Sequence, residues 1–250
     1  MPRHPESLLS LTDFNGGPLA ADLARKTFDD LLERHGYVLM SKVPETFDPV
    51  AFCKGLGGFV PQYTGVLVGD VRPEPGMEEF YHAGNTKPLY PHSEGYDFEG
   101  LPPRYLALWC QTPNTGAGGE TTLADAHAWV ASLDEDDRAF LRERVWSWET
   151  TDAMRHLGLD LHPRHPVIED HPDGTIVRYS FNNLVREDDP RIGPLLDSAR
   201  EFFAREHTAI QYERRDMLVF DNWRMLHART AFTDIGRHLR RIQIAHLETA

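Results

Sequence analysis

The sequence predicts a mainly β fold with flanking helices, that is, an α+β protein. Two observations lead to this prediction. From residue 60 onward, short β-rich runs are separated by Gly and Pro, and helical patterns are confined to the N-terminal part and to stretches between those runs. The chain has 250 residues, 40% of them hydrophobic, which is enough for one substantial core. Because no internal repeat or linker-like stretch interrupts it, a single domain over residues 1–250 is expected.

The first elements alternate between helix and strand. "LAADLARKTFDDLLERHG" (19–36) has the spacing of an amphipathic helix that ends at Gly36. The apolar run "YVLM" (37–40) that follows predicts a buried strand, and "DPVAFCKGLGG" (48–58) predicts a second, short helix.

The later elements are mostly strands, with one helical insertion around residues 124–146. Within the insertion, the acidic run of residues 134–137, "DEDD", is expected near a helix start, where negative charge suits the helix dipole. The other predicted elements are, in order, a strand at 104–112, a hairpin at 165–180 with its turn at 172–174, a helix at 191–206, and strands within 209–222 and 239–247. Scattered short strands with helices at the start and in insertions favour a double-stranded β-helix, a cupin-like jelly roll. Many other α+β domains would give a similar pattern.

The overall charge excludes some classes of partner. Lys and Arg total 26 against 39 Asp and Glu, a formal net charge of −13, so binding to nucleic acid or to an anionic membrane surface is not expected. The two cysteines suggest no disulfide framework. The N-terminus lacks a basic start followed by an apolar run, so no signal peptide is predicted and the cytoplasm is the expected location.

A candidate for half of a metal site lies in "KPLYPHSEGYDFEG". On extended chain, His92 and Glu94 would project to the same face, and imidazole plus carboxylate suits Fe(II), Mn(II) or Zn(II). The second histidine that a facial triad needs has a candidate in His227, just past the apolar run from Met217 to Phe220. The alternatives are that the first pair decorates an ordinary polar loop, and that His227 forms hydrogen bonds in a turn.

The C-terminal strand adds a possible anion site. A strand with arginines on one face and isoleucines on the other indicates an arginine that points into a cavity, where a planar guanidinium matches a carboxylate. An internal salt bridge is the alternative. In "GRHLRRIQIAHL", alternate residues of the predicted strand point to opposite faces. One face carries Arg237, Leu239, Arg241 and Gln243. The other face carries Arg240, Ile242, Ile244 and His246.

Four motifs in this order resemble those of the taurine dioxygenase (TauD/TfdA) family of Fe(II)- and 2-oxoglutarate-dependent oxygenases. They are "PHSE" (91–94), "GGET" (118–121), "DNWRMLHAR" (221–229) and "RHLRR" (237–241). Much of the family has aspartate as the carboxylate of this first motif, whereas this chain has glutamate. In this respect the motif resembles that of the clavaminate synthase-like branch, which oxidises amino-acid-derived substrates.

The resemblance implies a role for each motif. His92, Glu94 and His227 would bind iron. Arg241 would pair with the far carboxylate of 2-oxoglutarate, with Arg237 as the second candidate. Thr121 would hydrogen-bond the same carboxylate unless Thr122 takes its place. Arg224 and Arg229 occupy positions typical of the family and are interpreted as structural.

The resemblance also implies the reaction. With Fe(II), 2-oxoglutarate and O₂, such an enzyme would form succinate and CO₂ while hydroxylating an unactivated C–H bond; desaturation or cyclisation needs only a different substrate placement. The expected substrate is small and amino-acid-derived, free or bound to a carrier protein, in specialised metabolism such as antibiotic biosynthesis. The oligomeric state stays open.

The substrate site is predicted from residues near the motifs. In some amino-acid oxygenases similar to this branch, an arginine four residues beyond the cosubstrate arginine holds the substrate carboxylate; counted from Arg241, that position is Ala245. This departure argues against a free α-amino acid bound in that way. The candidate substrate-binding residues are Tyr81, His82, Asn85, Tyr96, Arg178 and Asn182, each of which has a plainer interpretation as a surface or turn residue.

Two other functions use the same residues. A non-catalytic jelly-roll protein could bind a carboxylate ligand in the cavity, but it would tolerate loss of a metal ligand. A zinc hydrolase could use the same three ligands, but it leaves Arg241 and Thr121 without a role and lacks an obvious general base.

Overall fold

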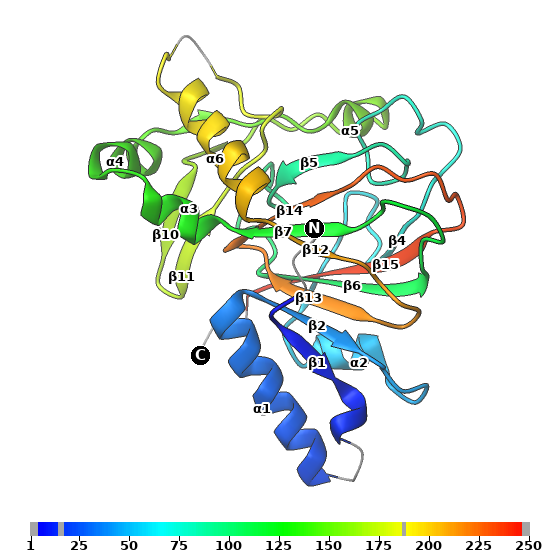
Figure 1. The fold of residues 1–250 in the computed structure, drawn as a ribbon. Helices are drawn as coiled ribbons and strands as arrows, with labels where there is room; N and C mark the ends of the chain where they lie inside the picture. Colours follow the sequence, from blue (N-terminus) through cyan, green and yellow to red (C-terminus); the bar gives the residue numbers. More distant parts are fainter. Residues whose placement is uncertain (1–4, 15–17, 187–188, 247–250) are drawn as a thin grey trace.

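Two sheets form the body of the protein in the computed structural model, which describes residues 5–14, 18–186 and 189–246 (Figure 1). Among these residues, the larger sheet has the strand order β1-β2-β13-β6-β15-β3, with β4 also paired to β15, and the smaller sheet has the order β12-β7-β14-β5. The larger sheet contains β1 (Leu8–Ser10), β2 (Tyr37–Ser41), β3 (Phe59–Val60), β4 (Val68–Val71), β6 (Tyr105–Thr112), β13 (Met217–Asp221) and β15 (His238–Ile244). The smaller sheet contains β5 (Leu89–His92), β7 (Thr121–Asp125), β12 (Thr208–Ile210) and β14 (Met225–Arg229).

The remaining elements surround these two sheets. A 3₁₀ turn, η1 (Leu11–Phe14), precedes the first helix. The helices are α1 (Pro18–His35), α2 (Pro49–Lys54), α3 (Ala126–Ser132), α4 (Glu135–Glu143), α5 (Asp152–His156) and α6 (Ile192–Glu206). Two small antiparallel pairs lie outside the main sheets: β8 (Trp146–Ser147) with β9 (Arg164–His165), and β10 (Ile168–His171) with β11 (Gly174–Val177).

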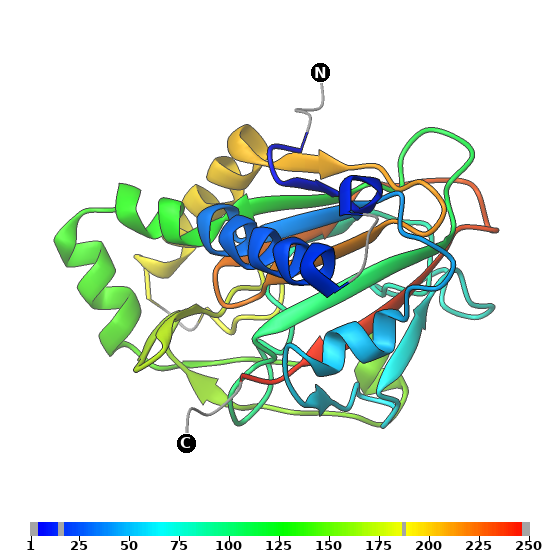
Figure 2. The same cartoon turned by 90° about the horizontal axis from the view of Figure 1, so that it is seen from below.

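The larger sheet is buried on both faces, which explains its continuous apolar runs. In β6, Leu106 and Leu108 point toward the smaller sheet and belong to the core between the two sheets. The alternate residues Ala107 and Trp109 pack with α1 and α2 on the outer face, which Figure 2 shows from below. Helices α3, α4 and α6 lie beside the smaller sheet (Figure 1). Together with residues of β7 and β14, they form a third hydrophobic cluster, which includes Trp129. This arrangement is a jelly roll flanked by helices, as the sequence predicted.

Local signals account for most element boundaries. Helix α1 ends where Gly36 adopts a positive φ of 75°, as expected from its sequence. In the stretch predicted as a helical insertion, the structure has α3 and α4, and the Asp134 side chain caps α4 by accepting from the backbone N–H of Asp137 at 2.8 Å. The β10–β11 hairpin turns at Pro172 and Asp173, within the predicted turn.

Two predicted strands are shorter than their sequence runs. Residues 209–222 contain β12 and β13, which belong to different sheets and are separated by the turn that includes Arg215. Strand β15 ends at Ile244, and Leu247 of the predicted run lies outside the described residues. Within the described parts of the chain, no helix is both long and apolar enough to cross a membrane.

Candidate metal centre

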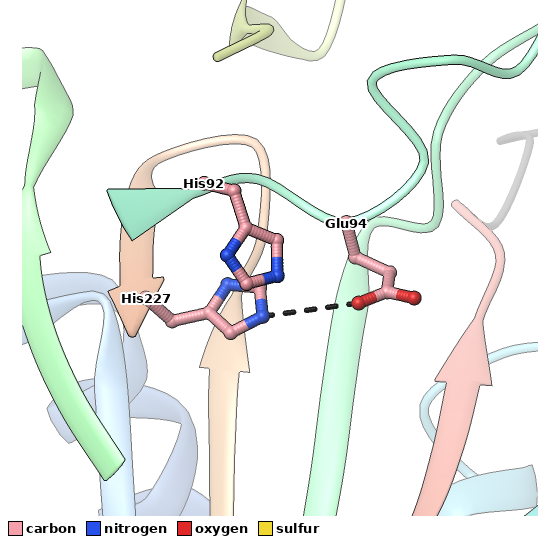
Figure 3. A group of neighbouring side chains, drawn as sticks. All are labelled: His92, Glu94 and His227. Carbon is pink, nitrogen blue, oxygen red and sulfur yellow. Dashed lines mark ion pairs between the residues drawn. The ribbon is translucent and has the colours of Figure 1, made fainter. Parts of the chain in front are cut away.

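The candidate metal ligands come together at the edge strand of the smaller sheet (Figure 3). Strands β5 and β14 are antiparallel neighbours in which His92 and His227 are directly paired, and Glu94 lies in the loop after β5. The two imidazole centroids are 4.1 Å apart, and Nε2 of His227 is 3.8 Å from Oε2 of Glu94. One ligand atom from each of the three residues lies within 4.8 Å of the others. The structure therefore brings together residues that are 135 positions apart in the chain (227 − 92).

The protonation of the two histidines fits metal binding. Burial lowers the pKa of His92, and it lowers the pKa of His227 well below its usual range, an effect that the neighbouring His92 and Arg241 reinforce. Nδ1 of His92 lies 2.8 Å from the Tyr90 carbonyl oxygen, which selects the tautomer with its proton on Nδ1 and leaves the Nε2 lone pair for a metal. Nδ1 of His227 is buried without a hydrogen-bond partner among the described residues. Two neutral imidazoles and a carboxylate fit Fe(II), although they do not by themselves distinguish it from Mn(II) or Zn(II).

Asn222 holds the backbone of Glu94 in place. Its side-chain oxygen accepts from the Glu94 N–H at 2.7 Å, while its amide nitrogen donates to the carbonyl oxygens of Glu94 and Pro103, both at 2.9 Å. Asn222 is 1% exposed and directly follows β13. A buried amide with both its oxygen and its nitrogen satisfied therefore connects the larger sheet to the loop that carries the carboxylate ligand.

The Glu94 carboxylate is held by strand β15. Gln243 donates to Oε1 at 2.7 Å, and Nη1 of Arg241 lies 3.1 Å from Oε2. Arg241 also donates from Nε and Nη2 to Oε1 of Gln62, at 3.0 and 2.7 Å. The arginine that the sequence assigned to 2-oxoglutarate thus forms an ion pair with the candidate metal ligand.

Arg237 occupies a different part of the same cavity. Its side chain is buried, with the residue 2% exposed, and its Nε donates to the Gly119 carbonyl oxygen at 3.1 Å. Its Nη1 has no partner among the described residues, and burial lowers the pKa of its guanidinium. Thr121 also lines the cavity and accepts a hydrogen bond from the Tyr212 hydroxyl at 2.9 Å.

The cavity combines a mostly apolar wall with an excess of positive charge. Glu94 is the one carboxylate among the described lining residues, against the three arginines Arg229, Arg237 and Arg241. Burial and the nearby Arg237 lower the pKa of Arg229 to about 9. Such a cavity favours an anionic ligand. Its other lining residues are Tyr63, Val71, Tyr81, His82, Ala83, Leu89, His92, Gly95, Tyr96, Leu106, Leu108, Thr121, Thr151, Met154, Ser180, His227, Ala228 and Leu239.

Two arginines of the "DNWRMLHAR" motif bind protein groups. Arg224 pairs with Asp125 at 2.7 Å and donates to the carbonyl oxygens at the end of α1. Arg229 donates to the carbonyl oxygens of Ala83 and Lys87 and to Oδ1 of Asn85, and so holds the segment before β5 in place. Both contacts agree with a structural role, although Arg229 also lines the cavity.

The predicted substrate residues fall into two groups. Tyr81, His82 and Tyr96 line the cavity. The other three, together with the alternative threonine Thr122, are not among its lining residues. Arg178 is fully buried, pairs with Glu169 at 3.2 Å, and donates to carbonyl oxygens of the 95–100 loop. Asn85 is tied to Arg229, and Asn182 is exposed.

Sequence reasoning gave no role to several residues around the centre. Asn222 lies in the "DNWRMLHAR" motif, and Gln243 lies on the strand face that carries Arg237 and Arg241. The sequence therefore indicated that both residues lie near the site, but not which groups they contact. Gln62 and Tyr63 lie in a loop without periodicity. The Tyr63 hydroxyl donates to Asp97, whose pKa burial raises to about 6.

The jelly roll with a His-x-Glu…His centre defines a class of metal-binding β-helix proteins. The family model for "Taurine catabolism dioxygenase TauD, TfdA family" matches residues 9–243. The chain belongs to this family.

Curated relatives match parts of the chain. Gamma-butyrobetaine dioxygenase of Homo sapiens is 28% identical over 153 residues, which are 55% of this chain and 39% of that protein. Tyrosine isonitrile desaturase of Pseudomonas aeruginosa is 27% identical over 194 residues, 70% of this chain and 64% of that protein. The chain thus spans less than two thirds of the length of these relatives.

A solved structure matches nearly the whole fold. An asparagine oxygenase in complex with Fe(II), 2S,3S-3-hydroxyasparagine and succinate superimposes with a TM-score of 0.74 at 18% identity, covering 96% of this chain and 94% of the other. At this identity the likeness establishes the fold, including its jelly-roll core.

Proposed function

We propose that this protein is an Fe(II)- and 2-oxoglutarate-dependent oxygenase that acts on a small, amino-acid-derived substrate. The observation that carries the proposal is the cluster of His92, Glu94 and His227 on the wall of a cavity. This cavity also contains the buried Arg237, whose Nη1 has no partner among the described residues. His92, Glu94 and His227 would hold the iron, and three protein ligands are the number that oxygenases of this kind use. The bound iron and 2-oxoglutarate supply the oxidising chemistry, and the protein supplies orientation and a dry cavity. A carboxylate-binding protein and a zinc hydrolase are the competing functions.

Three observations support Arg237, with Thr121, as the partner of the far carboxylate of 2-oxoglutarate. Arg237 is buried, its Nη1 has no partner among the described residues, and the hydrogen bond found for its side chain goes to a backbone carbonyl oxygen, that of Gly119. Arg241 has Glu94 and Gln62 as partners, but a metal cation at Glu94 would weaken the first of these contacts, so Arg241 stays a candidate for the same carboxylate. A buried guanidinium without a counter-ion is costly, so a carboxylate that reaches Arg237 would be strongly favoured. The sequence-based choice of Arg241 for this role remains the alternative.

Arg241 then becomes the candidate for the substrate. It lies four residues beyond Arg237, the spacing at which the family resemblance places an arginine for the substrate carboxylate, so the objection from Ala245 no longer applies. A metal cation at Oε2 of Glu94 would repel the guanidinium 3.1 Å away and would free it for an anion. The lining tyrosines Tyr63, Tyr81 and Tyr96 supply an amphipathic wall for the rest of the molecule.

Relatives support the substrate class. Their names refer to asparagine, to tyrosine isonitrile and to gamma-butyrobetaine, which are small molecules with an amino-acid skeleton or a related one. We infer that the present substrate is of this kind, free or carrier-bound, and that it belongs to specialised metabolism. Mass spectrometry of a panel of free and carrier-bound amino acids, with succinate formation as the second readout, tests this inference.

The reaction class is tested by anaerobic addition of Fe(II) and 2-oxoglutarate to the metal-free protein. The expected result is the weak visible charge-transfer band of the iron–2-oxoglutarate chelate, which His227→Ala should abolish. Bound metal without any band would contradict the oxygenase and favour one of the competing functions.

Titrating the band with 2-oxoglutarate separates the two arginines. Arg237→Ala should weaken 2-oxoglutarate binding by about 10-fold or more, because a charge-assisted bidentate bond is lost. Arg241→Ala should change 2-oxoglutarate affinity by less and raise the KM of the substrate. The reverse pattern would assign the cosubstrate to Arg241.

A further inference from the structure

A second cluster of metal-binding side chains lies outside the cavity. His171 ends β10, Asp173 lies in the turn before β11, and His246 follows β15. One ligand atom from each of these residues lies within 4.8 Å of the others. Oδ2 of Asp173 is 2.8 Å from Nε2 of His246 and 3.5 Å from Nδ1 of His171. Two imidazoles therefore converge on a single carboxylate oxygen.

These separations are close to those of a coordinated metal. In a tetrahedral site with metal–ligand distances of about 2.0–2.2 Å, neighbouring ligand atoms are about 3.3–3.6 Å apart. The 3.5 Å pair already has that spacing, and the 2.8 Å pair would need to open by roughly half an ångström. Nδ1 of His171 accepts a 3.2 Å hydrogen bond from the Asp173 backbone N–H, so its lone pair already faces the turn. A metal at Nδ1 would replace that long bond.

The surroundings allow a cation to enter and to remain bound. The three side chains are partly exposed, at 22% for His171, 37% for Asp173 and 16% for His246. They border a surface cavity with apolar walls at Val60 and Leu101. A positive side chain, Arg104, donates to the Asp173 carbonyl oxygen at 3.2 Å, but it is paired with Asp221 at 2.8 Å.

We propose that His171, Asp173 and His246 form a second divalent-metal site, suited to Zn(II), which ties the segment after β15 to the β10–β11 hairpin. Imidazole nitrogen and carboxylate oxygen are the ligands of such sites, and the cavity leaves a position for water. Strand β15 also carries Gln243, which holds Glu94, so the site stabilises one end of the strand that supports the first centre. The indole of Trp223 packs against both histidines, with ring centroids at 5.0 and 5.2 Å, and limits their movement.

The test uses the full-length, metal-free protein with His227→Ala as background, so that the first centre does not contribute. Isothermal titration with Zn(II), and the visible absorption of bound Co(II), should report one tight equivalent. Adding His246→Ala or Asp173→Asn should remove that equivalent; the asparagine retains the shape of the turn and so guards against misfolding.

The matched control is His162→Ala. His162 lies 3.2 Å from Asp160 on the surface and forms a His–Asp pair without a third ligand within the described parts of the chain. This substitution should leave the stoichiometry at one. The proposal is overturned if the His227→Ala background binds no tight equivalent, or if His162→Ala lowers binding as much as His246→Ala does. Neither outcome depends on oxygenase activity.

Discussion

Asn222 illustrates how a residue that need not touch a metal can determine the geometry of the candidate metal site. Its amide satisfies both backbone polar groups of Glu94 as well as the Pro103 carbonyl. The position of the Glu94 side chain depends on its backbone, so a change at Asn222 is expected to move a candidate ligand that lies 128 residues away in the chain. Such support usually matters for metal affinity almost as much as the ligands do.

Replacing this amide tests that dependence. Asn222→Ala leaves three buried backbone groups without their partners, so we expect a loss of about 2–4 kcal/mol in the free energy of unfolding and about 10- to 100-fold weaker Fe(II) binding. Denaturant unfolding of the metal-free protein and anaerobic Fe(II) titration measure the two effects. The exposed Asn182→Ala serves as the control of the same residue type. Unchanged Fe(II) affinity in Asn222→Ala would show that Glu94 is positioned by other contacts.

Single residues also show where local patterns are insufficient. Arg237 and Arg241 were predicted on one face, and both line the cavity. Four residues of extended chain span about 13 Å, so the two guanidiniums meet different partners. Which group each arginine binds depends on the residues that lie opposite it in the fold, and these cannot be read from the alternation in the strand.

Among the elements, the turn before β7 depends most on glycine. Gly118 has φ of 85°, and a Cβ at this position would collide with the carbonyl oxygen of Ala231 in the loop between β14 and β15. At the "GGET" motif, the loop before β7 thus lies very close to the loop between β14 and β15, and only glycine fits there. The motif ends at Thr121, the first residue of β7, which lines the cavity.

Gly118→Ala should therefore destabilise the protein by at least about 2 kcal/mol, because it adds left-handed strain to a backbone clash. The matched control is Gly116→Ala in the same loop, where an added Cβ meets no described atom within 4 Å and φ is not positive. Thermal and denaturant unfolding compare the two variants. Equal free energies of unfolding for the two variants would mean that the loop before β7 can move away from the loop between β14 and β15 without loss of stability.

Burial decides which elements can be predicted from sequence. Strands of the larger sheet have apolar residues on both faces, so β2, β6 and β13 stand out as continuous runs. Strands β3, β8 and β9 have two residues each, too few to establish any period. Their pairing is determined by contacts with distant segments.

At the scale of the whole molecule, the candidate metal centre of His92, Glu94 and His227 connects the two sheets. His92 and His227 belong to the smaller sheet, and Gln243 and Arg241 of the larger sheet hold the Glu94 carboxylate. A metal that binds all three ligands in the folded state alone adds its binding free energy to the stability of both layers.

Metal addition should therefore raise the melting temperature. Mn(II), a redox-stable probe, at about 100 times its Kd should add about 2.7 kcal/mol, which corresponds to an increase of roughly 5–10 °C for a chain of this size. The His246→Ala background excludes a contribution from the second cluster. In that background, His227→Ala should lose most of the shift and chelation should reverse it. A shift that survives His227→Ala would place the bound metal elsewhere.

The sequence alone determined the features that depend on neighbouring residues. The spacing of His92 and Glu94, the alternation in β15, the acidic run at the start of α4 and the helix end at Gly36 all follow from short-range geometry. The motif order also indicated the family and its jelly roll.

The tertiary structure decided what meets across the sheets. It paired His227 with His92, brought Arg241 to Glu94, left the Nη1 of Arg237 without a described partner, and gathered the second cluster from two segments 73 residues apart (246 − 173). These contacts depend on strand register and on packing between layers. Both are set by the burial of the whole core, so no local pattern in the chain records them.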